Sequence, residues 1–238
     1  MSAARSNAHP GTLIVYGYGP GISHATAMRF GREGYSLALV GRNEQRLADG
    51  VALLAGHGLD AQSYVSDAAD PADIRRTVAE IRRRQGNLSA VVWTAFRNGG
   101  VTNVLQTRPE DVERAFDIGV TGLLACVQAA FDDLTAARSA AILVANGAVG
   151  ENTSQADGFA TMLGIDGVAL ENAAKSKLVG MLAERLREFD VYVGEVTVAG
   201  SVAGTTTARG DAIDPADIAE LFWSLTRTRD RTRVRVVQ

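Results

Sequence analysis

The chain has 238 residues, enough for one α/β domain with a full core. Its 24 basic and 27 acidic side chains give a formal charge of −3, too small and too evenly mixed to favour nucleic acid. A single cysteine, Cys126, allows neither an internal disulfide nor a thiolate metal cluster, and no apolar run reaches the ~18 residues that span a bilayer. We expect a cytoplasmic protein with no metal site and no nucleic-acid or membrane partner.

Short apolar segments alternate with amphipathic stretches along the chain, after a flexible tail over residues 1–10. The apolar segments predict buried strands at residues 12–16, 36–40, 61–65, 90–94, 140–145, 191–198 and 233–237. The stretches between them predict helices at residues 25–33, 44–55, 71–84, about 110–135, 173–189 and 214–226. Apolar strands separated by amphipathic helices indicate a parallel sheet covered on both faces. Residues 11–238 are therefore predicted to form a single doubly wound, Rossmann-type α/β domain with about seven strands.

A glycine-rich turn, Tyr16-Gly17-Tyr18-Gly19-Pro20-Gly21-Ile22-Ser23, connects the first predicted strand to the first predicted helix. Glycines let the backbone turn tightly and approach a pyrophosphate, and the helix N-terminus offers N–H groups and a partial positive charge to the anion. Ser23 can add a hydroxyl donor. The turn thus predicts dinucleotide contacts from Gly17, Tyr18, Gly19, Gly21, Ile22 and Ser23. The alternative is a turn that binds no ligand.

The end of the second predicted strand indicates which dinucleotide is bound. A free ribose 2′-hydroxyl calls for an acidic residue about 20 positions after the turn, but the chain has Gly41-Arg42 there. An arginine at this place can hold a 2′-phosphate, and no carboxylate is present to repel it. We therefore expect NADP(H) as the cofactor. The alternative is that Arg42 is a surface residue near Glu44.

Taken in order, these features resemble the short-chain dehydrogenase/reductase family over residues 12–237. The turn is similar to the family's Thr-Gly-x-x-x-Gly-x-Gly, Ser66-Asp67-Ala68 to its adenine-contacting segment, residues 116–122 to its fourth helix, and Ala199-Gly200-Ser201-Val202 to its loop after the sixth strand. The resemblance implies a seven-stranded parallel sheet, hydride transfer at a carbonyl or alcohol carbon of a small-molecule substrate, and a homodimer or homotetramer. It also implies cofactor contacts from Asp67, Ala68, Thr94, Ala95 and Val202.

The polar residues that this family uses after its fourth and fifth strands are replaced. The family's Asn-Asn-Ala-Gly corresponds to residues 93–96, which begin with Trp93, and its catalytic Asn corresponds to Gly119. The catalytic Ser falls within residues 145–148, where Asn146, one position early, is the nearest polar side chain. Arg97 and Asn98, in the loop after the fourth strand, are expected to face the nicotinamide side of the ligand crevice.

The family's Tyr-x-x-x-Lys pair has two alternative placements. One register puts Val168 and Asn172 at the two positions, and the other puts Glu171 and Lys175 there. Neither register supplies a tyrosine, because the tyrosines lie at positions 16, 18, 35, 64 and 192. The stretch over residues 146–174 also resembles an atypical branch of the family that keeps Ala-Lys without the tyrosine.

These features predict an atypical NADP(H)-dependent ketoreductase that reduces a ketone, such as a bulky aromatic or polyketide-like one, without a tyrosine proton donor. Hydride transfer is the cofactor's own chemistry, and losing a proton donor typically slows a reaction by ~10²- to 10⁴-fold without abolishing it. Lys175, Asn146 and Asn172 are the predicted catalytic residues. Lys175 either stabilises the developing alkoxide or holds the nicotinamide ribose, and Asn146 or Asn172 donates an amide hydrogen to the alkoxide oxygen. Two alternatives remain: a non-catalytic NADP(H)-binding sensor or inactive subunit, and a lyase or cyclase on the same fold.

Overall fold

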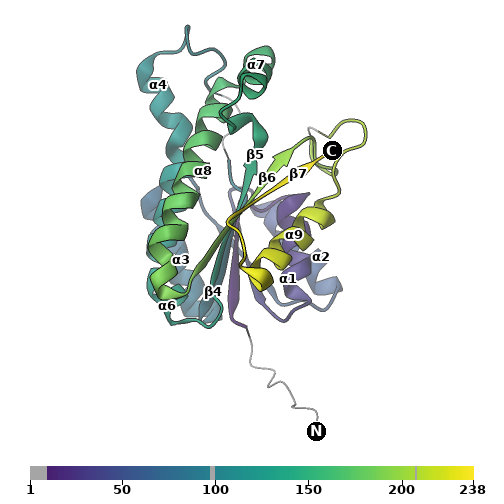
Figure 1. Ribbon diagram of the computed structural model, residues 1–238. Helices are drawn as coiled ribbons and strands as arrows, with labels where there is room; N and C mark the ends of the chain where they lie inside the picture. Colours follow the sequence, from purple (N-terminus) through teal and green to yellow (C-terminus); the bar gives the residue numbers. More distant parts are fainter. Residues whose placement is uncertain (1–9, 97–99, 207) are drawn as a thin grey trace.

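The computed structural model describes residues 10–96, 100–206 and 208–238 (Figure 1). Within these residues, seven parallel strands form one sheet in the order β3-β2-β1-β4-β5-β6-β7. Their bounds are Thr12–Tyr16 (β1), Ser36–Gly41 (β2), Ala61–Val65 (β3), Leu88–Trp93 (β4), Ala141–Gly147 (β5), Tyr192–Ala199 (β6) and Arg233–Val237 (β7). The doubly wound Rossmann-type sheet predicted from the sequence is confirmed.

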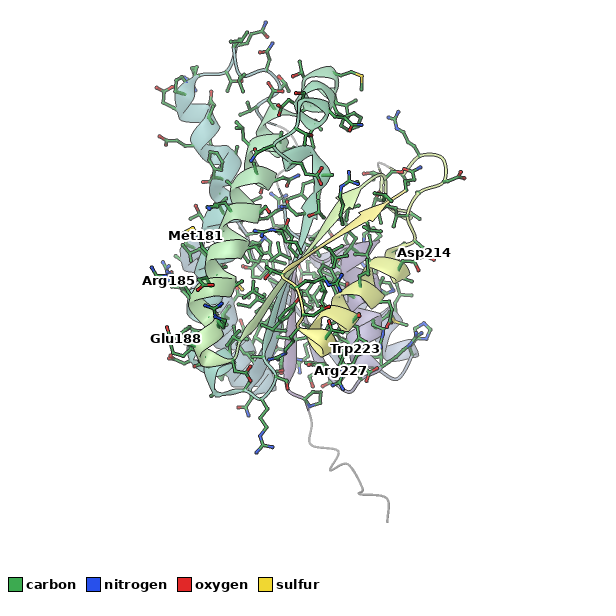
Figure 2. All side chains as sticks on the ribbon, in the orientation of Figure 1. Met181, Arg185, Glu188, Asp214, Trp223 and Arg227 are labelled. Atoms are coloured by element: carbon green, nitrogen blue, oxygen red, sulfur yellow. The ribbon has the colours of Figure 1, made fainter. Side chains whose placement is uncertain are left out.

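Helices cover both faces of the sheet (Figure 1). One face packs against α1 (Ile22–Gly31), α2 (Glu44–Gly56) and α9 (Pro215–Thr228). The other packs against α3 (Pro71–Gln85), α5 (Leu123–Ala129), α6 (Phe131–Ala136) and α8 (Asp166–Leu186). Figure 2 shows α8 and α9 on opposite sides, with Met181 and Arg185 on α8 and Trp223 and Arg227 on α9.

Burial of both faces of the sheet explains why the strands are unbroken apolar runs in the sequence. Along β1, Leu13 and Val15 point into one core, while Ile14 and Tyr16 point into the other. Successive side chains of a strand alternate in direction, so a strand covered on both faces needs apolar residues at every position. All five residues of β1 are buried, whereas residues of the edge strand β7 are alternately exposed and half-buried.

Side-chain caps determine where several helices begin. In four of them the preceding residue accepts a hydrogen bond from a first-turn N–H group, namely Asn43 before α2, Asp70 before α3, Asp214 before α9 and Thr153 before α7 (Ser154–Leu163). These residue types satisfy backbone donors that the helix itself leaves without partners. The first residues of α3 and α9 are prolines, which lack the N–H group.

The prediction of a single helix over residues 110–135 is wrong. The structure has α4 (Pro109–Glu113), a 3₁₀ turn at Arg114–Phe116, a π-helical segment at Asp117–Gly122, then α5 and α6 on either side of Ala130. The π segment contains two glycines, which weaken an α-helix. A methyl group on Gly122 would overlap the carbonyl oxygen of Ala68, so this close approach to the neighbouring loop requires glycine.

Two helices also begin earlier than the sequence predicts, and the prediction lacks α7. Helix α1 begins at Ile22 rather than at residue 25, and α8 begins at Asp166 rather than at residue 173. The early turns of α8 bury the polar residues Glu171 and Asn172, so they carry no hydrophobic periodicity. Helix α7 buries only two alanines, Ala156 and Ala160, and therefore also lacks an apolar stripe.

None of the helices in the described part of the chain combines the length and the apolar character needed to cross a bilayer. Within the same residues, no three His, Cys, Asp or Glu side chains gather as metal ligands do.

The single cysteine provides a test of the core. Cys126 is fully buried in α5, and this burial raises the pKa of its thiol to about 12. Because only the exposed thiolate reacts, we expect a thiol reagent to leave the native protein unmodified near neutral pH and to modify Cys126 in concentrated guanidinium chloride. Absorbance of the released chromophore measures both reactions. Rapid modification of the native protein would contradict the packing of α5.

Candidate functional site

The glycine turn is held between the ends of β2 and β4. The N–H groups of Gly17 and Tyr18 both donate to the carbonyl oxygen of Val40, at 2.9 Å each. Gly17 has a φ of +87°, and a methyl group there would overlap the backbone of Ala95. Both features require glycine at this position. The turn therefore lies where the carboxyl ends of the central strands meet.

The turn leads into an uncapped helix N-terminus. Ser23 accepts a hydrogen bond from the N–H group of Gly19 at 2.9 Å and donates to the same residue's carbonyl at 2.8 Å. Its hydroxyl thus closes the turn, in place of the free donor that the sequence suggested. No described side chain caps the first turn of α1, which starts directly after Gly21. Its N–H groups are therefore available to an anion.

Tyr18 supports the turn from behind. Its side chain is buried, its hydroxyl lies 2.8 Å from Nδ1 of His24 on α1, and its ring packs against Gly50 of α2. Through these contacts Tyr18 connects the turn to both α1 and α2.

Two arginines lie beside the turn at the start of α2. Arg42, after β2, is exposed and has neither a hydrogen bond nor an ion pair with any described residue, Glu44 included. Arg46 is one turn further on, and its Cδ lies 3.7 Å from the place of a methyl group on Gly19. The sequence prediction missed Arg46. Its only signal in the sequence was a second basic residue shortly after Arg42, in the first turn of the predicted helix.

The other predicted cofactor contacts lie at the same edge of the sheet. After β3, Asp67 accepts a hydrogen bond from the N–H group of Ala69 at 3.0 Å, next to the buried Ala68. After β4, the Thr94 hydroxyl donates to the carbonyl oxygens of Tyr16 and Gly17, at 3.0 and 3.1 Å.

The loop after β6 reaches back over the glycine turn. Cγ1 of Val202 and Cγ2 of Thr205 lie 3.9 and 3.0 Å from the place of a methyl group on Gly21. The Thr205 hydroxyl donates to the Val202 carbonyl at 2.7 Å, which holds this loop in shape. Arg97 and Asn98, predicted to face the same crevice, lie outside the described residues.

A cluster of buried polar side chains lies under α8, at the carboxyl end of β5 and the adjacent middle part of β6. Its members, each less than 10% exposed, are Asn146, Glu171, Asn172, Lys175, Glu195 and Thr197. Nδ2 of Asn146 donates to the carbonyl oxygen of Asn172 at 2.9 Å and to Oε1 of Glu195 at 3.0 Å. The three predicted catalytic residues are thus brought together. Sequence analysis missed Glu195, whose only signal was a charge within an apolar strand.

Side chains of α8 fill the space beside two glycines on neighbouring elements. Nδ2 of Asn172 lies 2.6 Å from the place of a Cβ on Gly147, at the end of β5. The carboxylate of Glu171 occupies the place of a Cβ on Gly119, in the π-helical segment. Any larger residue at either position would displace a polar side chain of α8.

Lys175 is fully buried in this cluster. Its burial lowers the pKa of the ammonium group, because the charged form loses its water, and the nearby carboxylates of Glu171 and Glu195 oppose that effect. The net direction is downward, so Lys175 releases a proton more readily than an exposed lysine does.

The tyrosines of the chain lie away from this cluster or face the core. Tyr16 stacks on Trp93 with ring centroids 4.6 Å apart, and both residues are fully buried. Trp93 is therefore a core residue. Tyr192 donates to the carbonyl oxygen of Arg231, at the other end of β6.

Comparisons with known proteins agree with this architecture. Residues 11–158 match the family described as short chain dehydrogenase. The chain is 39% identical over 104 residues to a putative ketoacyl reductase of the granaticin polyketide synthase from Streptomyces violaceoruber, covering 42% of this chain and 38% of that protein. It is 25% identical over 163 residues to a 3-oxoacyl-(acyl-carrier-protein) reductase of Staphylococcus aureus (strain Mu50), covering 66% and 65%. Each match spans less than two thirds of the relative.

A solved structure shares the whole fold. It is the NADPH-bound short chain oxidoreductase from Pseudomonas aeruginosa PAO1, described as containing an atypical catalytic centre, with a TM-score of 0.81, 17% identity and 95% coverage of both chains. At this level of identity the likeness is one of fold.

Two glycines of α2 test the support of the turn by Tyr18. A methyl group on Gly50 would overlap the Tyr18 ring, whereas one on Gly56 has open space. We expect Gly50→Ala to lower the free energy of unfolding by ~1–3 kcal/mol through overpacking, and Gly56→Ala to change it by at most about 1 kcal/mol, in the stabilising direction. Urea denaturation measures both. Equal stability of the two variants would contradict the contact between Tyr18 and α2.

Proposed function

The chain belongs to the short chain dehydrogenase family, and on this premise we propose that it is an NADP(H)-dependent ketoreductase that works without a tyrosine proton donor. The observation that carries the proposal is the buried group of Asn172 and Lys175 on α8, beside the carboxyl end of β5, at the edge of the parallel sheet where the glycine turn follows β1. The names of both curated relatives describe ketoacyl reductases, which supports a ketone as substrate. A bulky, polyketide-like ketone remains our prediction for its class.

The residues at the glycine turn fit NADP(H). The uncapped N-terminus of α1 suits a pyrophosphate, and Gly17 and Gly21 let the backbone come close to it. Arg42, which has no partner among the described residues, would hold the 2′-phosphate. The solved Pseudomonas aeruginosa relative is a complex with NADPH, which supports the same choice. When bound, the reduced cofactor supplies the hydride.

The buried cluster would supply the proton and hold the substrate oxygen. In this proposal the Asn172 amide donates a hydrogen bond to the carbonyl oxygen as negative charge develops on it, from the place where the family has its serine. Lys175, whose pKa is lowered by burial, then protonates that oxygen. Asn146 has a supporting role, because both of its amide hydrogens are used by Asn172 and Glu195. A homodimer or homotetramer also remains a prediction.

Reversing one charge tests the cofactor assignment. We expect Arg42→Asp to raise the NADPH dissociation constant tenfold or more, about 1.4 kcal/mol, because a charged contact is lost and a repulsive one is added. NADH binding should be unchanged or stronger. Arg138→Asp, an equal change at the exposed far end of β5, is the matched control. Fluorescence titration measures all three proteins. An unchanged NADPH constant in Arg42→Asp would remove the assignment of Arg42.

Activity tests the proposed chemistry. We expect the wild type to oxidise NADPH in the presence of at least one ketone of a panel that includes bulky aromatic diketones, followed by absorbance. Binding of NADPH without turnover on the whole panel would instead indicate a sensor or an inactive subunit. Absence of NADPH binding would favour a lyase or cyclase.

The same assay tests Asn172 through its contact with Gly147. We expect Asn172→Ala to lower kcat by ~10²- to 10³-fold, as the loss of one oxyanion donor typically does. Gly147→Ser alone should also lose activity, because its Cβ would displace the Asn172 amide. In the double variant the serine hydroxyl has room and replaces the amide, so kcat should recover by about tenfold over Asn172→Ala. A double variant no better than Asn172→Ala would contradict the role of Asn172.

A further inference from the structure

Glu195 is a carboxylate in the middle of a buried strand. It is 1% exposed, and its neighbours in β6, Val193 and Val196, are core residues. Removing an ionised carboxylate from water costs several kcal/mol, so such a group persists only where hydrogen bonds and opposite charges compensate it. The surroundings of Glu195 therefore indicate what it does.

Each carboxylate oxygen of Glu195 faces a different partner. Oε1 accepts hydrogen bonds from Nδ2 of Asn146 at 3.0 Å and from the Thr197 hydroxyl at 3.1 Å. Oε2 accepts no hydrogen bond from the described residues, and Nε of Arg233 on β7 lies 3.4 Å away in an ion pair. Two hydrogen bonds thus fix Oε1, whereas the negative charge on the Oε2 side is only partly neutralised by Arg233.

These partners also fix Glu195 beneath the part of α8 that carries Lys175. Asn146 bonds the carbonyl oxygen of Asn172 at 2.9 Å, and Nη2 of Arg233 bonds the carbonyl oxygen of Ser176 at 2.6 Å. The two contacts bracket Lys175 along the helix. The charged groups that surround its ammonium group are Glu171 on α8, Glu195 on β6 and, through Glu195, Arg233 on β7.

We propose that Glu195 is a positioning residue, whose carboxylate orients the Asn146 amide and supplies negative charge that keeps Lys175 protonated until the substrate oxygen takes the proton. Its effect on catalysis rests on the proposed function, whereas its effect on the charge of Lys175 does not. Arg233 weakens the effect of Glu195 on Lys175, because its guanidinium forms an ion pair with the same carboxylate from the edge strand β7. Half of the Arg233 side chain is exposed, so it screens Glu195 only partly.

The composition of the chain makes the charge of Lys175 directly measurable. Lys175 and Lys177 are its only lysines. Lys177, two residues away on the same helix, is exposed. Labelling the lysine ε-carbon with ¹³C gives two signals, and the pH dependence of the Lys175 signal reports its pKa, with the Lys177 signal as an internal reference.

We expect Glu195→Gln to lower the pKa of Lys175 by about 1, because a nearby negative charge is lost while volume and the Oε1 acceptor are kept. Arg233→Met should move the pKa of Lys175 upward, because Glu195 is then less neutralised. Glu184→Gln makes the same change at an exposed position of α8 and should leave the pKa of Lys175 in place. The Lys177 signal is the internal reference in all four proteins.

Identical titration of Lys175 in the wild type, Glu195→Gln and Arg233→Met would overturn the proposal. If Glu195→Gln does not fold, the direction of the shift in Arg233→Met decides, because that residue is on the edge strand and half exposed.

Kinetics test the catalytic consequence. A proton donor acts only below its pKa, so the loss of ketone reduction at alkaline pH should begin at lower pH in Glu195→Gln than in the wild type, and Glu184→Gln should keep the wild-type profile. An unshifted profile in Glu195→Gln would overturn the catalytic part. A wild type that reduces no ketone would end the proposed function, while the lysine titration would still test Glu195.

Discussion

The backbone of Gly17 lies against the backbone of Ala95, and the candidate site depends on this contact. The contact lies at the ends of β1 and β4, which are neighbours in the sheet. From β1 the sheet continues through β2 to β3, and from β4 it continues in the opposite direction through β5 and β6 to β7. At such a reversal, the loops after the two strands lead to opposite faces of the sheet and leave a crevice between them. The glycine turn lies at this reversal, and Val202 and Thr205 of the loop after β6 reach over its Gly21. A side chain at Gly17 would push apart the elements that form the crevice.

The second constraint is that side chains of α8 occupy the space beside two glycines on neighbouring elements. Asn172 and Glu171 extend into places that side chains of Gly147 and Gly119 would otherwise fill. Polar atoms of α8 thus fill both places, at the end of β5 and in the π-helical segment. The resemblance places the family's catalytic serine and asparagine at these two positions, so in the proposed function a different element, α8, supplies the donors.

The buried charges explain why this cluster tolerates little change. Lys175, Glu171 and Glu195 are all removed from water, so each depends on the others for compensation. Such a set is costly for stability, and a well-packed apolar core would replace it at no loss if it had no other role. Its position beside the carboxyl end of β5, at the same edge of the parallel sheet as the glycine turn, is where ligands bind in open parallel sheets.

The sequence by itself determined the strands, their parallel arrangement, the turn after β1 and the arginine after β2. Runs of apolar residues and glycines close together in the chain are enough to predict buried strands and tight turns. Three strands, β1, β3 and β7, have the predicted bounds. Only the tertiary structure decided the break in the helix over residues 110–135, the early start of α8 and the contacts of Asn172, Glu195 and Arg46. These features depend on residues far apart in the chain, such as Gly122 beside Ala68 or Asn146 beside Glu195, and local periodicity carries no record of such contacts.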